Sequence, residues 1–392
     1  MFLRSLCHRG YVLTSSLYFV TIAHLSASEI VLLGTAMSVT LLLTDVPAGA
    51  WADSIGRRWP LVSGQLVLAI GMIMTGLVKG FPLLLMTQVL WGLGWACVNG
   101  ADTAWLNDEL HEPSRIARVL TASARMDLAG GATGMVAFGL LAWVVSLSAA
   151  ILVSGIGIAL LAVLVAIGFV ERAFGPSSGK HWSRSWAVLR RGIRLSRRDH
   201  EILLVFAATL LVNAALMAGW LYPKRLLGLG FPSNSIPWYA SLLIVAAALG
   251  FLALRLVERR IDGVGVARRG YAIACVLGAA GLALMAFTSN ALLGGLGVLL
   301  TKGIADSITR PISVIWVNRR ITSEVRATAH SFLSQAESVG EITGGFVLAG
   351  IARLSGLGTT LMTAGALLAF VGIMVGRSRT DRAQAVSSNT AN

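Results

Sequence analysis

Charged residues are scarce in this sequence. They make up 13% of its 392 residues, whereas 56% are hydrophobic, and the mean hydropathy is +0.76. A soluble globular domain carries about 25% charged residues, so the composition excludes a water-soluble protein. A helix that crosses a bilayer needs about 20 largely apolar residues, so twelve would use about 240. The rest of the chain leaves room for short loops but not for a separate soluble domain.

Cysteine is also rare, and the three present lie far apart, at Cys7, Cys97 and Cys275. Their spacing indicates neither a disulfide framework nor a metal site. The sequence has no G-x-x-x-x-G-K-[ST] run to bind ATP phosphates, and its loops hold no nucleophile, metal or dinucleotide-binding constellation. We therefore expect no enzyme, no cofactor and no direct coupling to ATP.

Apolar stretches long enough to cross a bilayer recur along the chain, six before a polar break and six after it. The first is the most polar, so its helix can begin before residue 10. We expect the spans at residues 10–27, 30–51, 60–79, 81–106, 118–146, 148–170, 201–222, 236–256, 270–289, 291–317, 327–352 and 357–376.

The net charge of +14 would suit a nucleic-acid-binding protein, but the placement of the basic residues indicates membrane topology instead. With the N-terminus inside, the inner segments hold 25 of the 32 Lys and Arg, the outer loops 4 and the spans 3. Basic loops remain in the cytoplasm. Arginine exceeds lysine 28 to 4, as in GC-rich bacterial genomes. We therefore expect a multi-pass protein of the bacterial inner (plasma) membrane with both termini cytoplasmic and no nucleic-acid partner.

Two other segments have a recognisable composition. Arg4 and Arg9, followed by an apolar run, imitate a signal peptide. Its removal would leave an odd number of spans and break the charge asymmetry.

Between the two sets of spans, apolar residues recur at helical spacing among many arginines, at Trp182, Trp186, Leu189 and Ile193. This pattern predicts an amphipathic linker on anionic lipid, with a regulatory or partner-binding role as the alternative.

An internal repeat relates the two sets of spans. An offset of 211 residues aligns Gly92 with Gly303, Trp105 with Trp316 and Asn107 with Asn318. An offset of 210 aligns Thr133-Gly134 with Thr343-Gly344, and it also sets Asp127 against Glu337 and Gly130 against Gly340. Two six-helix halves in parallel repeat are typical of one large class of secondary transporters.

A loop motif lies between the second and third predicted spans. Residues 49–58 read Gly-Ala-Trp-Ala-Asp-Ser-Ile-Gly-Arg-Arg. They resemble the G-x-x-x-D-x-x-G-R-R signature of the major facilitator superfamily, and every fixed position is met. We expect Gly49 to allow close helix approach, Gly56 to allow a tight turn, and Arg57 and Arg58 to hold the loop in the cytoplasm.

The resemblance implies an all-α membrane protein of twelve transmembrane helices in two pseudo-symmetric six-helix halves. It also implies a latch, in which Asp53 pairs with an arginine or a helix N-terminus at the eleventh span. Asp45, Asp108 and Glu109 would join this latch, and a loop that only sets topology is the alternative. The implied parts are an N-terminal bundle at 1–172, a basic linker at 173–200, a C-terminal bundle at 201–376 and a cytoplasmic tail at 377–392.

Charged residues inside the predicted spans cost about 3 kcal/mol each in lipid, so they must face one another or water. Eight such residues are Asp102, Arg125, Asp127, Lys302, Asp306, Arg310, Glu337 and Glu341. Lys302, Asp306 and Arg310 are spaced to share one helical face. Through the repeat they correspond to Trp91, Trp95 and Asn99 on the fourth span.

In the resembled family, spans one, four, seven and ten line the substrate cavity. One aromatic wall and one ionic wall would suit a small amphiphile held by stacking and cation–π contact. A self-neutralising ion row on span ten, and ordinary packing of the two tryptophans, are the alternatives.

Glu337 and Glu341 lie one turn apart on the eleventh span. Two neighbouring carboxylates in an apolar medium do not both ionise easily, so one of them can carry the proton that a proton-coupled carrier needs. Asp127, the repeat counterpart of Glu337, is a third candidate. Salt bridges between the halves, to Arg125 or Arg310, are the competing explanation.

These observations predict a secondary active transporter that exports a small amphiphilic drug or metabolite by proton antiport and alternating access. Motifs of the family's drug–proton antiporters are incomplete: Gln88 and Trp91 stand where R-x-x-Q-G would be read, and residues 130–134 lack a proline. The antiporter subtype therefore stays open. The alternatives are a proton symporter that imports a nutrient or flips a lipid, and a non-transporting membrane sensor. The expected partners are a small molecule, protons and membrane lipid, and the expected state is a monomer.

Overall fold

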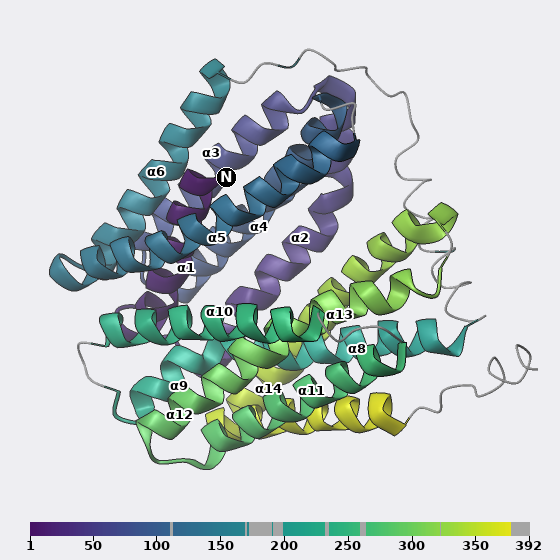
Figure 1. Ribbon diagram of the computed structural model, residues 1–392. Helices are drawn as coiled ribbons and strands as arrows, with labels where there is room; N and C mark the ends of the chain where they lie inside the picture. The colour runs from purple at the N-terminus through teal and green to yellow at the C-terminus, as the bar shows by residue number, and fades with distance from the viewer. Residues whose placement is uncertain are drawn as a thin grey trace, which may run out of the picture.

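A computed structural model shows an all-helical chain arranged as two bundles (Figure 1). It describes residues 1–109, 113–168, 171, 190, 199–231, 235–258, 264–321 and 323–377. The predicted linker at 173–200 and the predicted tail at 377–392 fall almost wholly outside the described residues.

The first bundle, drawn from purple to blue in Figure 1, contains one helix for each of the first six predicted spans. Its helices are α1 (Phe2–Thr21), α2 (Ala27–Ile55), α3 (Arg58–Leu77), α4 (Phe81–Glu109), α5 (Pro113–Val144) and α6 (Leu147–Gly168).

The second bundle, drawn from teal to yellow, contains the remaining spans, and two of these are broken into shorter pieces. Its elements are α8 (His200–Leu216), η1 (Met217–Leu221), α9 (Tyr222–Gly228), α10 (Ile236–Glu258), α11 (Val264–Phe287), α12 (Ala291–Val298), η2 (Leu299–Asp306), α13 (Ser307–Asn318) and α14 (Ser323–Arg377).

These elements make twelve spans when the pieces of each broken span are counted together and α14 is divided in two. The pieces α8, η1 and α9 form one span, and α12, η2 and α13 form another. Within α14, Gly356 has φ +84° and ψ 179°, so its backbone is not helical. The long α14 is therefore two spans that meet at Gly356, close to the predicted boundary between residues 352 and 357.

The first span was predicted at residues 10–27 with an earlier start allowed; α1 runs from Phe2 to Thr21, so the helix does begin earlier and the predicted end was wrong. Ser26 caps the next helix: its hydroxyl accepts a hydrogen bond from the Glu29 amide, and the Glu29 carboxylate accepts one from the Ser26 amide. This capping box starts α2 at Ala27. The chain upstream of it turns at His24, where φ is +51°.

Glycine pairs spaced four residues apart allow two helices to touch in each bundle. A Cβ atom at Gly130 or Gly134 of α5 would collide with backbone of α1, at Phe2 and Leu6. In the second bundle, a Cβ at Gly340 or Gly344 of α14 would collide with backbone of α8, at Leu210 and Ala214. The repeat predicted from these glycines is thus present in the packing of both halves.

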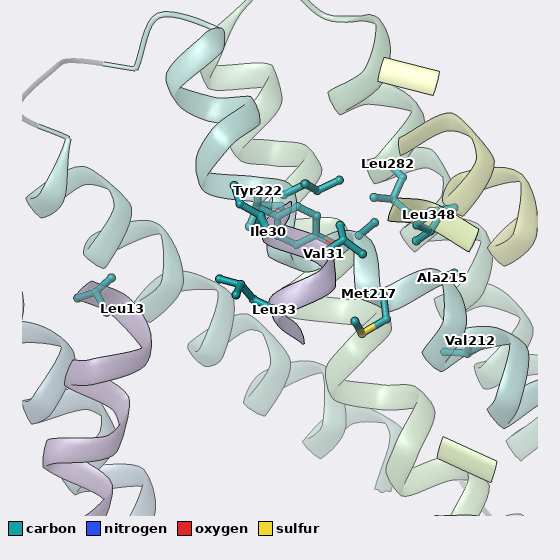
Figure 2. Close-up of a cluster of buried hydrophobic side chains, with 14 of the residues drawn as sticks. Leu13, Ile30, Val31, Leu33, Val212, Ala215, Met217, Tyr222, Leu282 and Leu348 are labelled. Atoms are coloured by element: carbon teal, nitrogen blue, oxygen red, sulfur yellow. The ribbon is translucent and has the colours of Figure 1, made fainter. Parts of the chain in front are cut away.

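The two bundles contact each other at one end of the molecule. Leu13, Ile30, Val31 and Leu33 of the first half belong to a buried apolar core that also contains Tyr222 of the second, and Figure 2 shows Ile30 and Val31 beside Tyr222. The Lys224 ammonium donates a hydrogen bond of 2.6 Å to the Leu25 carbonyl across the bundles.

Burial changes along α2, from the contacting end of the molecule to the other. Val31 and Leu33 are fully buried, whereas Leu43 is 67% exposed and Trp51 and Ile55 are also exposed. The main contact of α2 with the second bundle is made with α14. The bundles are therefore closed together around the first turns of α2 and separate toward its last turns.

Candidate functional site

A cavity of about 330 Å³ lies between the two bundles. The spans expected to line it were one, four, seven and ten, and the structure adds two, eight and eleven. The lining residues are Tyr11, Val12, Ser15, Ser16 and Phe19 of α1, Met37 and Ser38 of α2, Gln88 and Trp91 of α4, Asn213 and Leu216 of α8, Met217, Gly219 and Trp220 of η1, Tyr222 of α9, Tyr239 and Leu243 of α10, Lys302 and Asp306 of η2, and Glu341 of α14.

The wall from the first bundle is aromatic and neutral. The Tyr11 hydroxyl lies 3.1 Å from the Thr75 hydroxyl, and the Gln88 amide nitrogen lies 3.4 Å from the Tyr11 oxygen. Both Tyr11 and Gln88 are buried, at 3% and 2% exposure. A buried polar side chain is costly unless it is hydrogen-bonded, so this network holds α1, α3 and α4 together behind the cavity.

Trp91 and Trp95 stack with His8 of α1 on the same side. Their ring planes differ by 10° with centroids 5.3 Å apart, and the His8 ring lies 4.6 Å from the Trp95 ring. Trp91 lines the cavity, whereas Trp95 and Asn99 are not among its lining residues. The predicted aromatic wall is therefore Trp91 together with α1 residues that sequence reasoning missed.

The wall from the second bundle carries the ions. The Lys302 ammonium and the Asp306 carboxylate form an ion pair at 2.5 Å, and both line the cavity. Arg310 does not line it. Its guanidinium instead lies 3.1 Å from the Glu337 carboxylate of α14.

The backbone conformation of the tenth span explains why Lys302 and Asp306 line the cavity and Arg310 does not. Residues Leu299–Asp306 form a π-helical segment, which an α-helix follows from Ser307. A π-helix bonds i to i+5 and holds more residues per turn than an α-helix. The expectation that Lys302, Asp306 and Arg310 share one face assumed a regular α-helix, and it was wrong because the face rotates at this segment.

Glu341 joins the two bundles inside the cavity. The Ser38 hydroxyl of α2 donates a hydrogen bond of 2.7 Å to one Glu341 carboxylate oxygen. Ser38 is 1% exposed, and Glu341 also lines the cavity. One carboxylate is thus both a wall of the cavity and a contact between the halves.

The other two candidate acidic residues have partners of their own and do not line the cavity. Glu337 pairs with Arg310, but both residues belong to the second bundle, so this salt bridge does not connect the halves as the competing explanation required. Asp127 is half-buried on α5, and its backbone carbonyl accepts a hydrogen bond of 2.7 Å from Ser5 of α1. Neither Glu337 nor Asp127 lines the cavity.

The loop motif folds as a tight turn between α2 and α3. Gly56 has φ +105°, in a region that strongly favours glycine. Arg57 forms an ion pair with Asp53 one turn earlier, and its backbone amide donates a hydrogen bond of 2.6 Å to Glu171 after α6. Arg58 donates a hydrogen bond to the carbonyl of Ala166 on α6.

Some latch residues differ from expectation. The prediction of close helix approach at Gly49 was wrong in this conformation, because nothing lies within 4 Å of a Cβ built there. The halves are apart at this end of α2, which explains the open space. Asp45 is exposed on α2, and the side chains of Asp108 and Glu109 lie outside the described residues.

The part of the chain that the structure describes contains no group of three His, Cys, Asp or Glu side chains that could hold a metal ion. By length and composition, ten of its helical segments could cross a membrane. Two bundles of membrane-spanning helices around a central cavity with ionic side chains in its wall are the architecture of a membrane transporter.

The chain belongs to the Major Facilitator Superfamily, whose family model matches residues 1–345. It is therefore a transporter and not an enzyme. The chain is similar to Multidrug resistance protein 2 of Bacillus subtilis (strain 168), with 30% identity over 90 residues. That similarity covers 23% of this chain and only 22% of the length of the relative.

Solved structures share the fold over nearly the whole chain. The nucleoside transporter NupG has a TM-score of 0.77 at 13% identity, covering 96% of this chain and 97% of its own. A bacterial homolog of the human lysosomal transporter Spinster, in an inward-facing and occupied conformation, has a TM-score of 0.73 at 16% identity, covering 95% and 93%. The human organic anion transporter MFSD10 has a TM-score of 0.62 at 16% identity, covering 95% and 96%.

Proposed function

We propose that the protein exports a small amphiphilic compound from the cell in exchange for protons, by alternating access. The observation that carries this proposal is the position of Glu341. Its carboxylate lines the central cavity and bonds to Ser38 of the opposite half at 2.7 Å. A proton or a cargo molecule that reaches this carboxylate therefore acts on the cavity and on the contact between the halves together.

The coupling step follows from electrostatics. A carboxylate that is buried in a membrane protein is costly when charged and needs a proton or a cation to neutralise it. Two cations lie on the neighbouring span, but Lys302 is paired with Asp306 at 2.5 Å and Arg310 with Glu337 at 3.1 Å, so neither is bonded to Glu341. Glu341 would therefore exchange a proton for cargo, and the exchange would bias the equilibrium between the two closures of the bundles.

The orientation proposed for the membrane comes from charge placement. The bundles contact each other around Leu25 and Lys224, at the end of the molecule that carries few basic residues, and separate toward the Arg57–Arg58 loop. Basic loops remain in the cytoplasm. We propose that this conformation opens to the cytoplasm of a bacterium, that both termini are cytoplasmic, and that the monomer is the working unit in the inner membrane.

The loop motif would act in the opposite conformation. Here Asp53 pairs with Arg57 in the turn that follows its helix, and Glu171 accepts a hydrogen bond from the Arg57 amide, so the contacts of the motif lie within the first half. When the halves close at this end, α14 would approach α2 at Gly49, and Asp53 would lie at the contact. We propose that this contact is the latch of the outward-open state.

Transport into proteoliposomes tests the function. Purified protein is reconstituted with an imposed pH gradient of either sign, and the uptake of labelled amphiphilic compounds is measured. Antiport predicts uptake that requires an acidic lumen and a proton efflux in step with it. Symport, which would mark an importer, predicts accumulation only with an acidic exterior. Flux that is indifferent to both gradients would contradict proton coupling.

The matched variants are Glu341→Gln and Val163→Ala. Glu341→Gln keeps the shape of the side chain and removes its charge, so gradient-driven uptake should fall to background while the protein stays folded. Val163 is exposed on α6, far from the cavity lining, so its variant should transport normally. Undiminished coupling in Glu341→Gln would remove the basis of the proposal.

A further inference from the structure

We infer that Arg310 is the counter-ion that Glu341 takes when it releases its proton, and that Glu337 holds this guanidinium until then. This inference rests on the proposed function, because it supplies a partner for the carboxylate that would exchange a proton for cargo. It follows from the positions and charges of the acidic and basic side chains on the tenth and eleventh spans.

The two spans place their charged side chains next to one another. Glu337 and Glu341 lie one turn apart on α14, and Arg310 of α13 lies 3.1 Å from the Glu337 carboxylate. The charges of Glu337, Asp306 and Arg310 all act on Glu341. The guanidinium therefore has a second carboxylate within electrostatic range of the one that it contacts.

Arg310 is held at one edge only. The contact with Glu337 is made by the Nε atom, and the terminal nitrogens of Arg310 form no hydrogen bond with the residues that the structure describes. The Arg310 side chain is 70% exposed, whereas that of Glu337 is 14% exposed. A long, exposed side chain with unused donors can move to a neighbouring acceptor without breaking other contacts.

Lys302, the other cation of the tenth span, is less suited to this role. Its ammonium donates a hydrogen bond of 2.5 Å to Asp306, and it is not among the described groups whose charge acts on Glu341. Glu341 can receive a new partner, because Ser38 bonds only its Oε2 atom and no described residue bonds Oε1. Arg310 is therefore the cation placed to pair with Glu341.

The charges of this cluster balance when it binds one proton. Lys302 and Arg310 supply two positive charges, and Asp306, Glu337 and Glu341 supply three negative ones. An unbalanced carboxylate within the membrane is costly. While Arg310 pairs with Glu337, the proton belongs on Glu341. If Arg310 pairs with Glu341 instead, Glu337 is left without a cation and takes the proton, so only the position of the proton changes.

Neighbouring side chains do not alter this balance. The first bundle lines the cavity with neutral residues only, and Ser38 is the one that contacts Glu341. Asp45 of α2 is exposed about two turns from Ser38, toward the open end of the molecule. On the other side, α8 contributes the neutral Asn213, and α11 contributes the buried Tyr271, whose hydroxyl is uncharged at physiological pH.

The exchange would move the proton toward the open end. Gly345 of α14 packs against Thr35 of α2 where the bundles are closed, so Glu337 lies nearer the open end than Glu341 does. A proton that passes from Glu341 to Glu337 therefore approaches the opening, while the guanidinium moves the opposite way. Once Arg310 is paired with Glu341, it opposes the return of the proton.

Infrared titration follows the proton on Glu341 directly and needs no cargo. Purified protein in detergent is titrated with pH, and the C=O stretching band of protonated carboxyl groups is followed by difference spectroscopy. The part of this band that is absent in Glu341→Gln belongs to Glu341. The midpoint pH of that part is then compared between variants.

Glu337→Gln keeps the shape of the side chain and releases Arg310 to Glu341. We expect the Glu341 midpoint to fall by about one pH unit or more, because an adjacent cation favours the charged carboxylate. Arg310→Gln should raise the midpoint instead, because it removes a cation from beside two carboxylates. A midpoint that does not fall in Glu337→Gln would overturn the inference, and this test needs only one isosteric variant.

A double variant distinguishes a guanidinium that moves from one that stays in place. If it moves, Arg310→Gln should raise the midpoint more in the Glu337→Gln background than in the unmodified protein, because there it removes a direct ion pair. Equal shifts in both backgrounds would mean that Arg310 remains where it is, and would contradict the inference. Arg353→Gln is the control, since it removes an exposed arginine near the other end of the same span and should leave the midpoint unchanged.

The titration also separates this inference from the proposed function. Unequal shifts in a protein without gradient-driven flux in proteoliposomes would support Arg310 as the counter-ion and contradict the transport proposal. Proton-coupled flux together with equal shifts would support transport and contradict the role of Arg310.

Discussion

The indole of Trp220 packs directly against Gly34, across the boundary between the bundles. A Cβ atom at Gly34 would overlap the indole ring. Trp220 lies in η1, the 3-10 segment that interrupts the seventh span, and Gly34 lies on the buried face of α2. The ring also lines the cavity, so it separates the cavity from the closed end of the molecule.

Enlarging Gly34 should therefore open this end. Gly34→Leu is expected to shift the protein away from the conformation described here, because its side chain and the Trp220 ring cannot occupy one space. Pulsed electron paramagnetic resonance between spin labels at cysteines replacing Ala23 and Leu227, in a cysteine-free background, would report a longer distance. Gly350→Ala is the control, since a Cβ there meets open space. An unchanged distance in Gly34→Leu would contradict a seal at Trp220.

The glycine contact between α14 and α8 gives a stability prediction. A Cβ at Gly344 would collide with the backbone of Ala214, which cannot move aside as a flexible side chain can. Gly344→Ala should lower the free energy of unfolding by about 1–3 kcal/mol, the usual cost of overpacking. Thermal unfolding in detergent measures it, again with Gly350→Ala as the control on the same helix. Equal midpoints for the two variants would show that the helices can separate at no cost.

The architecture followed from the sequence because its signals are local or periodic. Span length, the positive charge of loops and the repeated glycines each act within a few turns, and the fold class and the family were both confirmed. The first span looked the most polar in the sequence, but its Ser and Thr side chains do not lower its helicity inside the bundle. There they donate to carbonyls of their own helix, as Thr14 does to Gly10.

The site was less predictable because it depends on contacts between distant residues. Ser38 and Glu341 are 303 positions apart, and no local pattern relates a serine on one helix to a carboxylate on another. Arg310 was misplaced because the π-helical turn at Leu299–Asp306 leaves no clear mark in the sequence. Tyr11 and Trp220 were missed because aromatic residues near helix ends read as ordinary packing or interfacial residues.

Substitution of Gly56 should lower stability, whereas substitution of Gly49 should affect transport only. Gly56 has φ +105° beside Glu171, so Gly56→Ala should cost about 1–3 kcal/mol of stability, as strained backbone does. Gly49 meets nothing in this conformation, so Gly49→Ala should leave thermal unfolding unchanged. If α14 approaches Gly49 in the opposite state, the same variant should still slow transport in proteoliposomes. Normal transport in Gly49→Ala would argue against the proposed latch at this position.

A buried charge cluster in the second bundle gives the last prediction. The Arg268 guanidinium lies 3.2 Å from one Glu201 oxygen, and the Trp316 indole donates to the other at 3.1 Å. Glu201 and Arg268 are each 6% exposed. They join α8, α11 and α13 at one end of the bundle.

Removing one charge of this cluster should be worse than removing both. Glu201→Leu leaves the guanidinium buried without its counter-charge and should cost about 3–5 kcal/mol, whereas Glu201→Leu combined with Arg268→Leu should recover much of that loss. Thermal unfolding of the two single variants and the double variant forms the cycle that measures the coupling. Strictly additive losses would mean that the two charges are each solvated separately. Recovery in the double variant would instead show that the loss comes from an uncompensated buried charge, because the apolar replacements pack without the ions.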